Sequence, residues 1–212
     1  MLLKLLKLTL ILGLVFPLFA SANEIKIKKQ NFYNLVVPAV NQVYTELDTQ
    51  YKLIQHDVEQ NDINTSLVRE MMKKYKAKDY QDLLQRMKPH PKSVALAQAA
   101  MESGWATSRF TKVANNLFGV WSFNKNEPRV PASQKRGNKT IYVKKYKTIA
   151  DSIRDYYKVL ATGRAFSEFR AQKMRSEDPY KLVKKLDKYS EKGSEYGKEL
   201  AQVIRYNKFY NY

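Results

Sequence analysis

The stretch of this 212-residue chain that could carry chemistry ends in a single acidic residue, Glu102. An apolar, alanine-rich segment precedes it, and Gly104 and Trp105 follow directly. A carboxyl group at the end of such a helix is poorly hydrated and lies near the negative end of the helix dipole, and both effects favour its protonated form. An acid that stays protonated near neutral pH can protonate the leaving oxygen of a glycosidic bond. The pattern alone is equally compatible with an ordinary glutamate that faces water.

The elements that must position this acid are predicted to be mostly helical. Pro91 suits the first turn of the helix that ends near Glu102, and the alanines of that helix would let other helices approach closely. Apolar periodicity and capping residues predict further helices over residues 32–59, 65–75, 79–87, 148–160, 178–187 and 195–206. Alternating residues and a Gly137–Asn138 turn predict a β-hairpin over residues 130–146. The expected fold class is therefore mainly α (α+β), with one small β element after the Glu102 helix.

The N-terminus has the features of a secretory signal peptide. Lys4 and Lys7 precede an apolar run, and residues 20–22 (ASA) fit a small-residue cleavage site, which places the signal at residues 1–22. The alternative is an uncleaved membrane anchor, although the run is short for a membrane span. Residues 23–30 are expected to form a short, charged and mobile leader. No later segment of the sequence is apolar enough to span a membrane.

Composition limits the kinds of partner and cofactor. The full chain carries a net charge of +18, and removal of residues 1–22, which hold two lysines and no acid, leaves +16. Such a charge indicates an anionic partner such as cell-wall polymer, anionic lipid or nucleic acid, and secretion disfavours nucleic acid. The chain has no cysteine, and its two histidines, His56 and His90, lie outside any metal-ligand spacing. We therefore expect no metal and no cofactor, and we expect both histidines at the surface or in linkers.

Three sequence stretches, in order, resemble the bacterial glucosaminidase family of peptidoglycan hydrolases, which includes the FlgJ-type cell-wall enzymes. They are AQAAMESGW (97–105), NNLFGVW (115–121) and DSIRDY (151–156), with a weaker fourth at 189–196. Within the family, the chain is most similar to the Bax-type secreted proteins, from about Lys29 to the C-terminus. The resemblance implies a lysozyme-like domain at 89–212 with a small β lobe, preceded by a helical extension at 31–88. It also implies cleavage of the glycan strand after N-acetylglucosamine.

The resemblance also assigns roles to individual residues. Glu102 matches the general acid, and Tyr196 matches a late tyrosine often considered catalytic, although a packed core aromatic is the competing interpretation. Tyr189 matches an earlier tyrosine and is expected to be structural. The residues expected to line the substrate cleft are Trp105, Asn116, Phe118, Trp121 and Tyr156. For Phe118 a hydrophobic plug under the loop is the favoured interpretation, Trp105 could be a cleft wall or a core cover, and Tyr156 could pack near the site.

The chain departs from the family pattern where several members have a second acid. Residues 131–137 (PASQKRG) contain no carboxylate, so Glu127 is the candidate second acid, with an ordinary surface charge as the favoured alternative. Asp151 is expected to cap a helix and Asp155 to be structural. We therefore hypothesise that no second carboxylate is needed, because the 2-acetamido group of the substrate can attack the anomeric carbon with help from Tyr196.

The sequence thus predicts an exported, monomeric endo-β-N-acetylglucosaminidase that acts on peptidoglycan, with a periplasmic address implied by the Bax-type similarity. Three alternatives remain open. The same fold could bind cell-wall glycan without cleaving it, or it could act as a muramidase or lytic transglycosylase. The protein could also be a basic periplasmic adaptor that binds a membrane or a partner through the helix at 32–59. An apolar stripe such as that of this helix, however, more often packs on its own domain.

Overall fold

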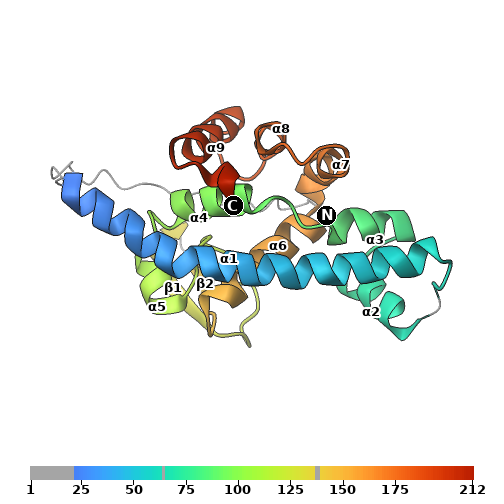
Figure 1. The fold of residues 1–212 in the computed structure, drawn as a ribbon. Coiled ribbons are helices and arrows are strands. Elements are labelled where there is room, and N and C mark those ends of the chain that lie inside the picture. Colours follow the sequence, from blue (N-terminus) through green and yellow to red (C-terminus); the bar gives the residue numbers. More distant parts are fainter. Residues whose placement is uncertain (1–21, 64, 137–138) are drawn as a thin grey trace.

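The computed structural model describes residues 22–63, 65–136 and 139–212 (Figure 1). The predicted signal peptide, apart from Ala22, and the predicted Gly137–Asn138 turn lie outside the described residues. None of the helices in the described ranges is long and apolar enough to cross a membrane.

The described chain is mainly helical with one small antiparallel hairpin, which confirms the predicted fold class. The strands are β1 (Arg129–Arg136) and β2 (Lys139–Lys144), whose register shifts between Pro131 and Lys135. The helices are α1 (Ala22–Glu59), α2 (Ser66–Tyr75), α3 (Tyr80–Met87), α4 (Lys92–Glu102), α5 (Arg109–Ala114), α6 (Ile149–Thr162), α7 (Ser167–Arg175), α8 (Pro179–Val183) and α9 (Ser194–Tyr206), with short 3-10 turns at Arg164–Phe166 and Phe209–Asn211.

Helix α1 is the longest element and contributes to two hydrophobic clusters. Its first half packs in the main core with α4 and α6, through Phe32, Val36, Val40 and Val43. Its second half packs with α2 and α3 in a smaller cluster. Residues 23–30, expected as a mobile leader, are instead the first turns of α1. This stretch has no glycine or proline, so nothing in it stops the helix from extending.

Several helix starts confirm the predicted caps. The side chain of Thr65 accepts a hydrogen bond from the backbone nitrogen of Val68, and Asp79 caps α3 in the same way. Thr148 and Asp151 form a complete capping box at the start of α6. These caps are local signals, which is why the sequence alone identified them.

Other elements differ from the prediction. Leu35 belongs to the apolar pattern that predicted the helix over residues 32–59, but it is 47% exposed. Helix α8 ends at Val183 rather than near residue 187, and α5 and α7 were not predicted. Helix α7 has few apolar residues, and it buries Arg170 and Lys173 beside Phe169, so its sequence lacks the apolar stripe that marks a helix.

Helix α4 lies at the centre of the molecule, as its alanines predicted (Figure 1). Its residues from Ser93 to Ala100 are all buried. Helices α1, α8 and α9 and the last 3-10 turn all contact it. The small side chains allow this close packing on every side, so the end of α4 is held rigidly where Glu102 stands.

Candidate active site

Glu102 is the last residue of α4, and the chain turns sharply directly after it. Gly104, Trp105 and Ala106 all have positive φ angles, of 57°, 64° and 61°. The side-chain oxygen of Ser103 accepts a hydrogen bond from the backbone nitrogen of Ala106 at 2.7 Å, which holds this turn. Left-handed backbone is costly for residues with a Cβ atom, so two such residues in succession mark a strained turn next to the acid.

The carboxyl group of Glu102 is partly exposed and has one hydrogen-bond donor. The hydroxyl of Tyr196 donates to Oε1 at 2.7 Å. Burial raises the pKa of Glu102 to about 7, against smaller lowering effects of the Tyr196 hydroxyl and the charge of Lys192, while Glu199 raises it further. Burial therefore outweighs the hydrogen bond, and the group is protonated in part of the molecules at neutral pH.

Tyr196 lies in the first turn of α9 and is 2% exposed. Its ring stacks on that of Tyr189 with centroids 5.5 Å apart, and its hydroxyl oxygen accepts a hydrogen bond from Nε2 of Gln98 at 2.9 Å. Burial and the neighbouring Glu102 raise its pKa well above the usual value, so the phenol keeps its proton. Tyr196 is thus both a core aromatic and a partner of the acid, which joins the two interpretations of the sequence.

Gln98 is a site residue that sequence reasoning missed. It lies one helical turn before Glu102, and residues four apart share a face of a helix. This spacing within an otherwise apolar stretch was the signal that could have identified it. Gln98 is fully buried, and its Oε1 accepts a hydrogen bond from the hydroxyl of Tyr156 at 2.6 Å.

His90 was expected at the surface or in a linker, and this expectation is wrong. It is 2% exposed, its Nε2 lies 3.0 Å from the hydroxyl oxygen of Tyr156, and its ring stacks on Tyr157 at 4.2 Å. Burial and the charge of Lys173 lower its pKa well below the usual value. The flanking prolines suggested an exposed linker, and only the packing of α6 and α7 shows otherwise. His56 is exposed, as expected.

Asn116, Phe118 and Tyr156, predicted around the cleft, are all buried. The burial of Phe118 and Tyr156 agrees with the packing interpretation of these two residues, whereas Asn116 does not line a cleft. The amide of Asn116 donates to the carbonyl oxygens of Val120 and Lys144 and accepts from the nitrogen of Val120. Phe118 stacks on Tyr156 with centroids 4.0 Å apart, which is the plug arrangement. These residues shape the loop and the core behind the site, because their polar groups are already used within the protein.

Trp105 and Trp121 keep part of their rings exposed. Trp105 packs edge-on against Phe32 at 5.1 Å, and the amine of Lys29 lies 4.7 Å from its ring. Trp121 pairs with β2 through Val143. Its neighbour Phe123, which sequence reasoning did not select, has its ring centroid 6.1 Å from that of Trp121 and is 70% exposed.

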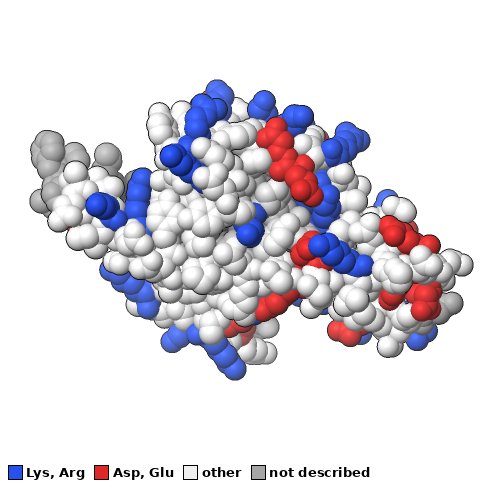
Figure 2. All heavy atoms as spheres, viewed as in Figure 1, with Lys and Arg blue, Asp and Glu red and all other residues white. Residues whose placement is uncertain are grey.

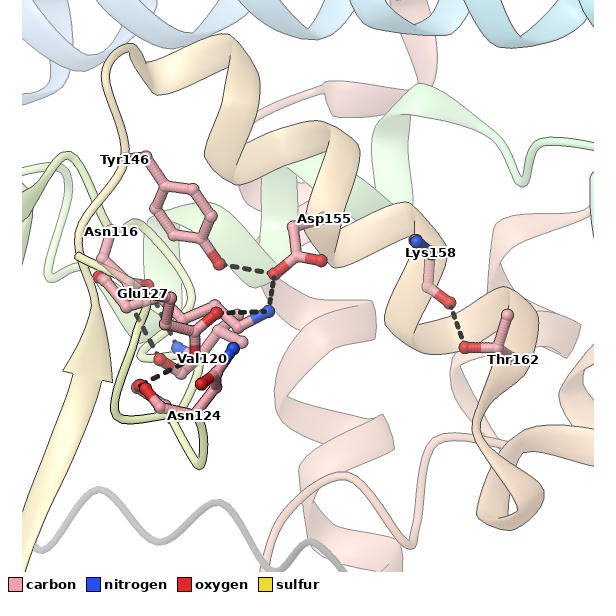
Figure 3. A network of polar contacts seen from close by, with 10 residues as sticks. Asn116, Val120, Asn124, Glu127, Tyr146, Asp155, Lys158 and Thr162 are labelled. Carbon is pink, nitrogen blue, oxygen red and sulfur yellow. Dashed lines mark hydrogen bonds and ion pairs between the residues drawn. The ribbon is translucent and has the colours of Figure 1, made fainter. Parts of the chain in front are cut away.

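Glu127, the candidate second acid, belongs to a polar network around Lys144 (Figure 3). Its Oε1 accepts from the hydroxyl of Ser122 at 2.7 Å, and its Oε2 lies 3.9 Å from Nζ of Lys144. The same amine bonds Asp155 at 2.9 Å, and the hydroxyl of Tyr146 donates to Asp155 at 2.7 Å. Ser122 and Lys144 therefore hold the carboxylate of Glu127 in place. Glu127 also lines a cavity of about 470 Å³, together with His90 and Lys173.

No group of three potential metal ligands comes together among the residues that the structure describes. The arrangement at Glu102 does not require a metal, because a carboxylic acid with a raised pKa can itself supply the proton for bond cleavage. A buried helix ending in such an acid, with a small β-hairpin in the same domain, is the arrangement of a lysozyme-like fold.

Residues 77–209 match the family model of glucosaminidases, described as mannosyl-glycoprotein endo-beta-N-acetylglucosaminidase. The chain belongs to this family, which confirms the resemblance of its sequence motifs. Over 154 residues it is 28% identical to the protein bax of Escherichia coli strain K12, a match that covers 66% of this chain and 54% of that protein. The chain thus spans about half the length of this curated relative.

The fold is shared with a solved structure at low sequence identity. The catalytic domain of the autolysin Auto from Listeria monocytogenes superposes with a TM-score of 0.52 at 19% identity, covering 93% of this chain and 98% of that domain. A peptidoglycan hydrolase from Sphingomonas sp. A1 gives a TM-score of 0.47 at 21% identity, covering 60% of this chain and 85% of the other.

Proposed function

We propose that the protein is a peptidoglycan hydrolase, an endo-β-N-acetylglucosaminidase that uses Glu102 as its general acid. The observation that carries this proposal is the carboxyl of Glu102, within the family stretch 97–105, whose pKa burial raises to about 7. The name autolysin, given to a structural relative, is in keeping with a cell-wall substrate. The net charge of +18 favours an anionic polymer of this kind.

The proposed reaction begins with a proton on Oε2 of Glu102, because Oε1 accepts from Tyr196. Oε2 gives this proton to the glycosidic oxygen while the bond from that oxygen to the anomeric carbon breaks. The carbonyl oxygen of the 2-acetamido group forms a bond to the anomeric carbon and stabilises the positive charge. The Glu102 carboxylate then takes a proton from a water molecule as the water oxygen attacks the anomeric carbon. The bond from that carbon to the acetamido oxygen breaks, which restores the acetamido group and leaves the acid protonated again.

This scheme assigns no chemical role to Glu127, and the variant Glu127→Gln tests it. We expect the hydrolysis rate to change by less than about threefold, because the amide keeps the acceptor for Ser122 and loses only a distant contact with Lys144. A loss of turnover in a folded variant that still binds glycan would contradict the scheme and restore the two-carboxylate mechanism.

Mass spectrometry of soluble fragments from purified peptidoglycan tests which bond is cleaved. Fragments with N-acetylglucosamine at the reducing end would support the proposal. Fragments ending in N-acetylmuramic acid would indicate a muramidase, and anhydro ends would indicate a lytic transglycosylase. Glycan binding without fragments would indicate a non-catalytic wall-binding protein.

We further propose that the protein is exported and acts outside the cytoplasm, in the periplasm, as a monomer. The signal-like sequence at residues 1–22 supports export. Cell fractionation with an antibody to the mature chain would test this location. Detection of the protein in the cytoplasmic fraction alone would contradict export.

A further inference from the structure

A continuous chain of buried hydrogen bonds runs from His90 to Glu102. Nε2 of His90 lies 3.0 Å from the hydroxyl oxygen of Tyr156, which donates to Oε1 of Gln98 at 2.6 Å. Nε2 of Gln98 donates to the hydroxyl oxygen of Tyr196 at 2.9 Å, and Tyr196 donates to Oε1 of Glu102 at 2.7 Å. The four supporting side chains are almost fully buried, so water does not compete for these bonds.

When Glu102 is ionised, and therefore accepts only, this hydrogen-bond chain has a single direction that satisfies all its members. A tyrosine hydroxyl has one proton, and Tyr196 uses it on Glu102, so its oxygen must accept from the amide nitrogen of Gln98. The amide oxygen of Gln98 therefore faces Tyr156 and accepts the single proton of that hydroxyl. The oxygen of Tyr156 must then accept from His90, which requires the proton of the imidazole to be on Nε2.

The surroundings of His90 keep its ring neutral, and the direction of the hydrogen-bond chain then places the single imidazole proton on Nε2. Burial and the nearby amine of Lys173 lower its pKa well below the usual value, so the ring is neutral and has one N–H. The ring of Tyr157 stacks on the imidazole at 4.2 Å, whereas its hydroxyl contacts only the backbone carbonyl of His90. Lys173 itself donates to the carbonyl oxygen of Lys88. The imidazole is thus fixed in place by groups that are not members of the hydrogen-bond chain.

We propose that His90, Tyr156 and Gln98 are positioning residues that set the direction in which the Tyr196 hydroxyl points at Glu102, and thereby keep Oε2 as the oxygen that delivers the proton. In the opposite direction, Tyr196 would donate to Gln98 and present a lone pair to Glu102. A protonated Glu102 would then donate to Tyr196 instead of to the glycosidic oxygen. The direction of the hydrogen-bond chain therefore decides whether Glu102 donates its proton to the substrate or to Tyr196. This inference rests on the proposed function of Glu102.

The variant Tyr156→Phe removes one link and keeps the ring that stacks on Phe118. Oε1 of Gln98 then lacks a donor, so the amide is free to turn and accept from Tyr196, which releases Glu102. We expect kcat to fall about tenfold with KM within about twofold, because the acid is misdirected while the binding surface is unchanged. The variant Gln98→Met should behave differently, because it removes the competing acceptor and leaves Glu102 as the partner of the Tyr196 hydroxyl. Its kcat should therefore fall less than that of Tyr156→Phe.

The matched control is Tyr157→Phe, at the adjacent position on α6. It removes a buried hydroxyl that is not a member of the hydrogen-bond chain. Its kcat should remain within about twofold of the native protein. Native-like circular dichroism of each variant establishes that it is folded.

A second readout does not depend on turnover. NMR titration of the Glu102 side-chain carboxyl should show its pKa rising by about one pH unit in Tyr156→Phe, because a hydrogen bond to the ionised form is lost, and rising less in Gln98→Met, where that bond is kept. The charges of Lys192 and Glu199 are unchanged in both variants, and Tyr157→Phe should titrate like the native protein. If Tyr156→Phe and Tyr157→Phe titrate alike, the positioning role is overturned. Absence of hydrolysis by the native protein would instead overturn the proposed function, while the titration would still test the chain.

Discussion

At Glu102, burial and hydrogen bonding act on the same carboxyl group in opposite directions. The buried environment disfavours the charged form, whereas the Tyr196 hydroxyl and the charge of Lys192 favour it. The balance leaves the pKa at about 7, between the value of a solvated glutamate and that of a fully isolated one. A group with this pKa can give up a proton and take one back at neutral pH, as both steps of glycoside hydrolysis require.

This pKa has a consequence for stability with a definite sign. Between about pH 4.5 and pH 7 the folded protein keeps a proton that the unfolded chain has released, so the stability contribution of Glu102 decreases as the pH rises through this window. Glu102→Gln, which keeps an acceptor for Tyr196, should raise the free energy of unfolding by about 2 kcal/mol at pH 8 and leave it unchanged near pH 4. Urea denaturation at both pH values measures this, and equal effects at the two pH values would contradict the raised pKa.

At the scale of elements, the close contact between α8 and α9 holds Tyr196 against the end of α4. Gly197 makes this contact possible, since a Cβ atom there would lie 2.6 Å from the backbone carbonyl oxygen of Val183. The obstacle is backbone rather than a flexible side chain, so the helices must separate to accept any larger residue. The position of α9 in turn sets the bond between Tyr196 and Glu102.

Gly197→Ala should therefore destabilise the protein by about 2 kcal/mol and lower the hydrolysis rate at least about fivefold. Thermal unfolding and fragment release measure the two effects. The comparison variant is Ser194→Ala at the start of the same helix, which should change neither quantity appreciably. Full activity of Gly197→Ala would show that the spacing between α8 and α9 does not position the acid.

The elements that sequence alone could predict are those with local signals. The alanines of α4, the capping box at Thr148 and the caps at Thr65 and Asp79 act within a few residues of themselves. The acid at Glu102 was predicted for the same reason, together with the family motifs. His90 and the helix that buries Lys173 were missed, because charged and polar residues become buried only through contacts between distant segments. Asn116 was predicted to line the cleft, and its burial depends on packing that no spacing reveals. The burial of Phe118 and Tyr156 agrees with the packing roles that were predicted for them.

At the scale of the whole molecule the net charge is +18, and on the face seen in Figure 2 the positive side chains are scattered rather than gathered in one patch. Figure 2 shows Lys and Arg distributed across the visible face, among fewer acidic groups. The field of such a surface attracts an anionic polymer over distances comparable to the Debye length and does not select one binding position. We therefore infer that the net charge speeds the encounter with the cell wall, whereas the region around Glu102 selects the position at which the glycan binds.

The rate of peptidoglycan hydrolysis should accordingly fall several-fold between about 50 mM and about 500 mM salt. Uncharged chitin oligosaccharides provide the control, because their cleavage should depend little on salt over the same range. Turbidity clearing and oligosaccharide chromatography measure the two rates. Equal salt dependence for both substrates would contradict a role for the net charge in encounter.

The measurement that tests the central claim most directly compares mature native protein with Glu102→Gln for release of soluble fragments from purified peptidoglycan, with binding to the same glycan measured in parallel. Our account predicts that the variant binds glycan as the native protein does but releases fragments at least about a hundredfold more slowly, because it has lost the proton donor. Fragment release by Glu102→Gln at the native rate would contradict the account and move the chemistry to another residue.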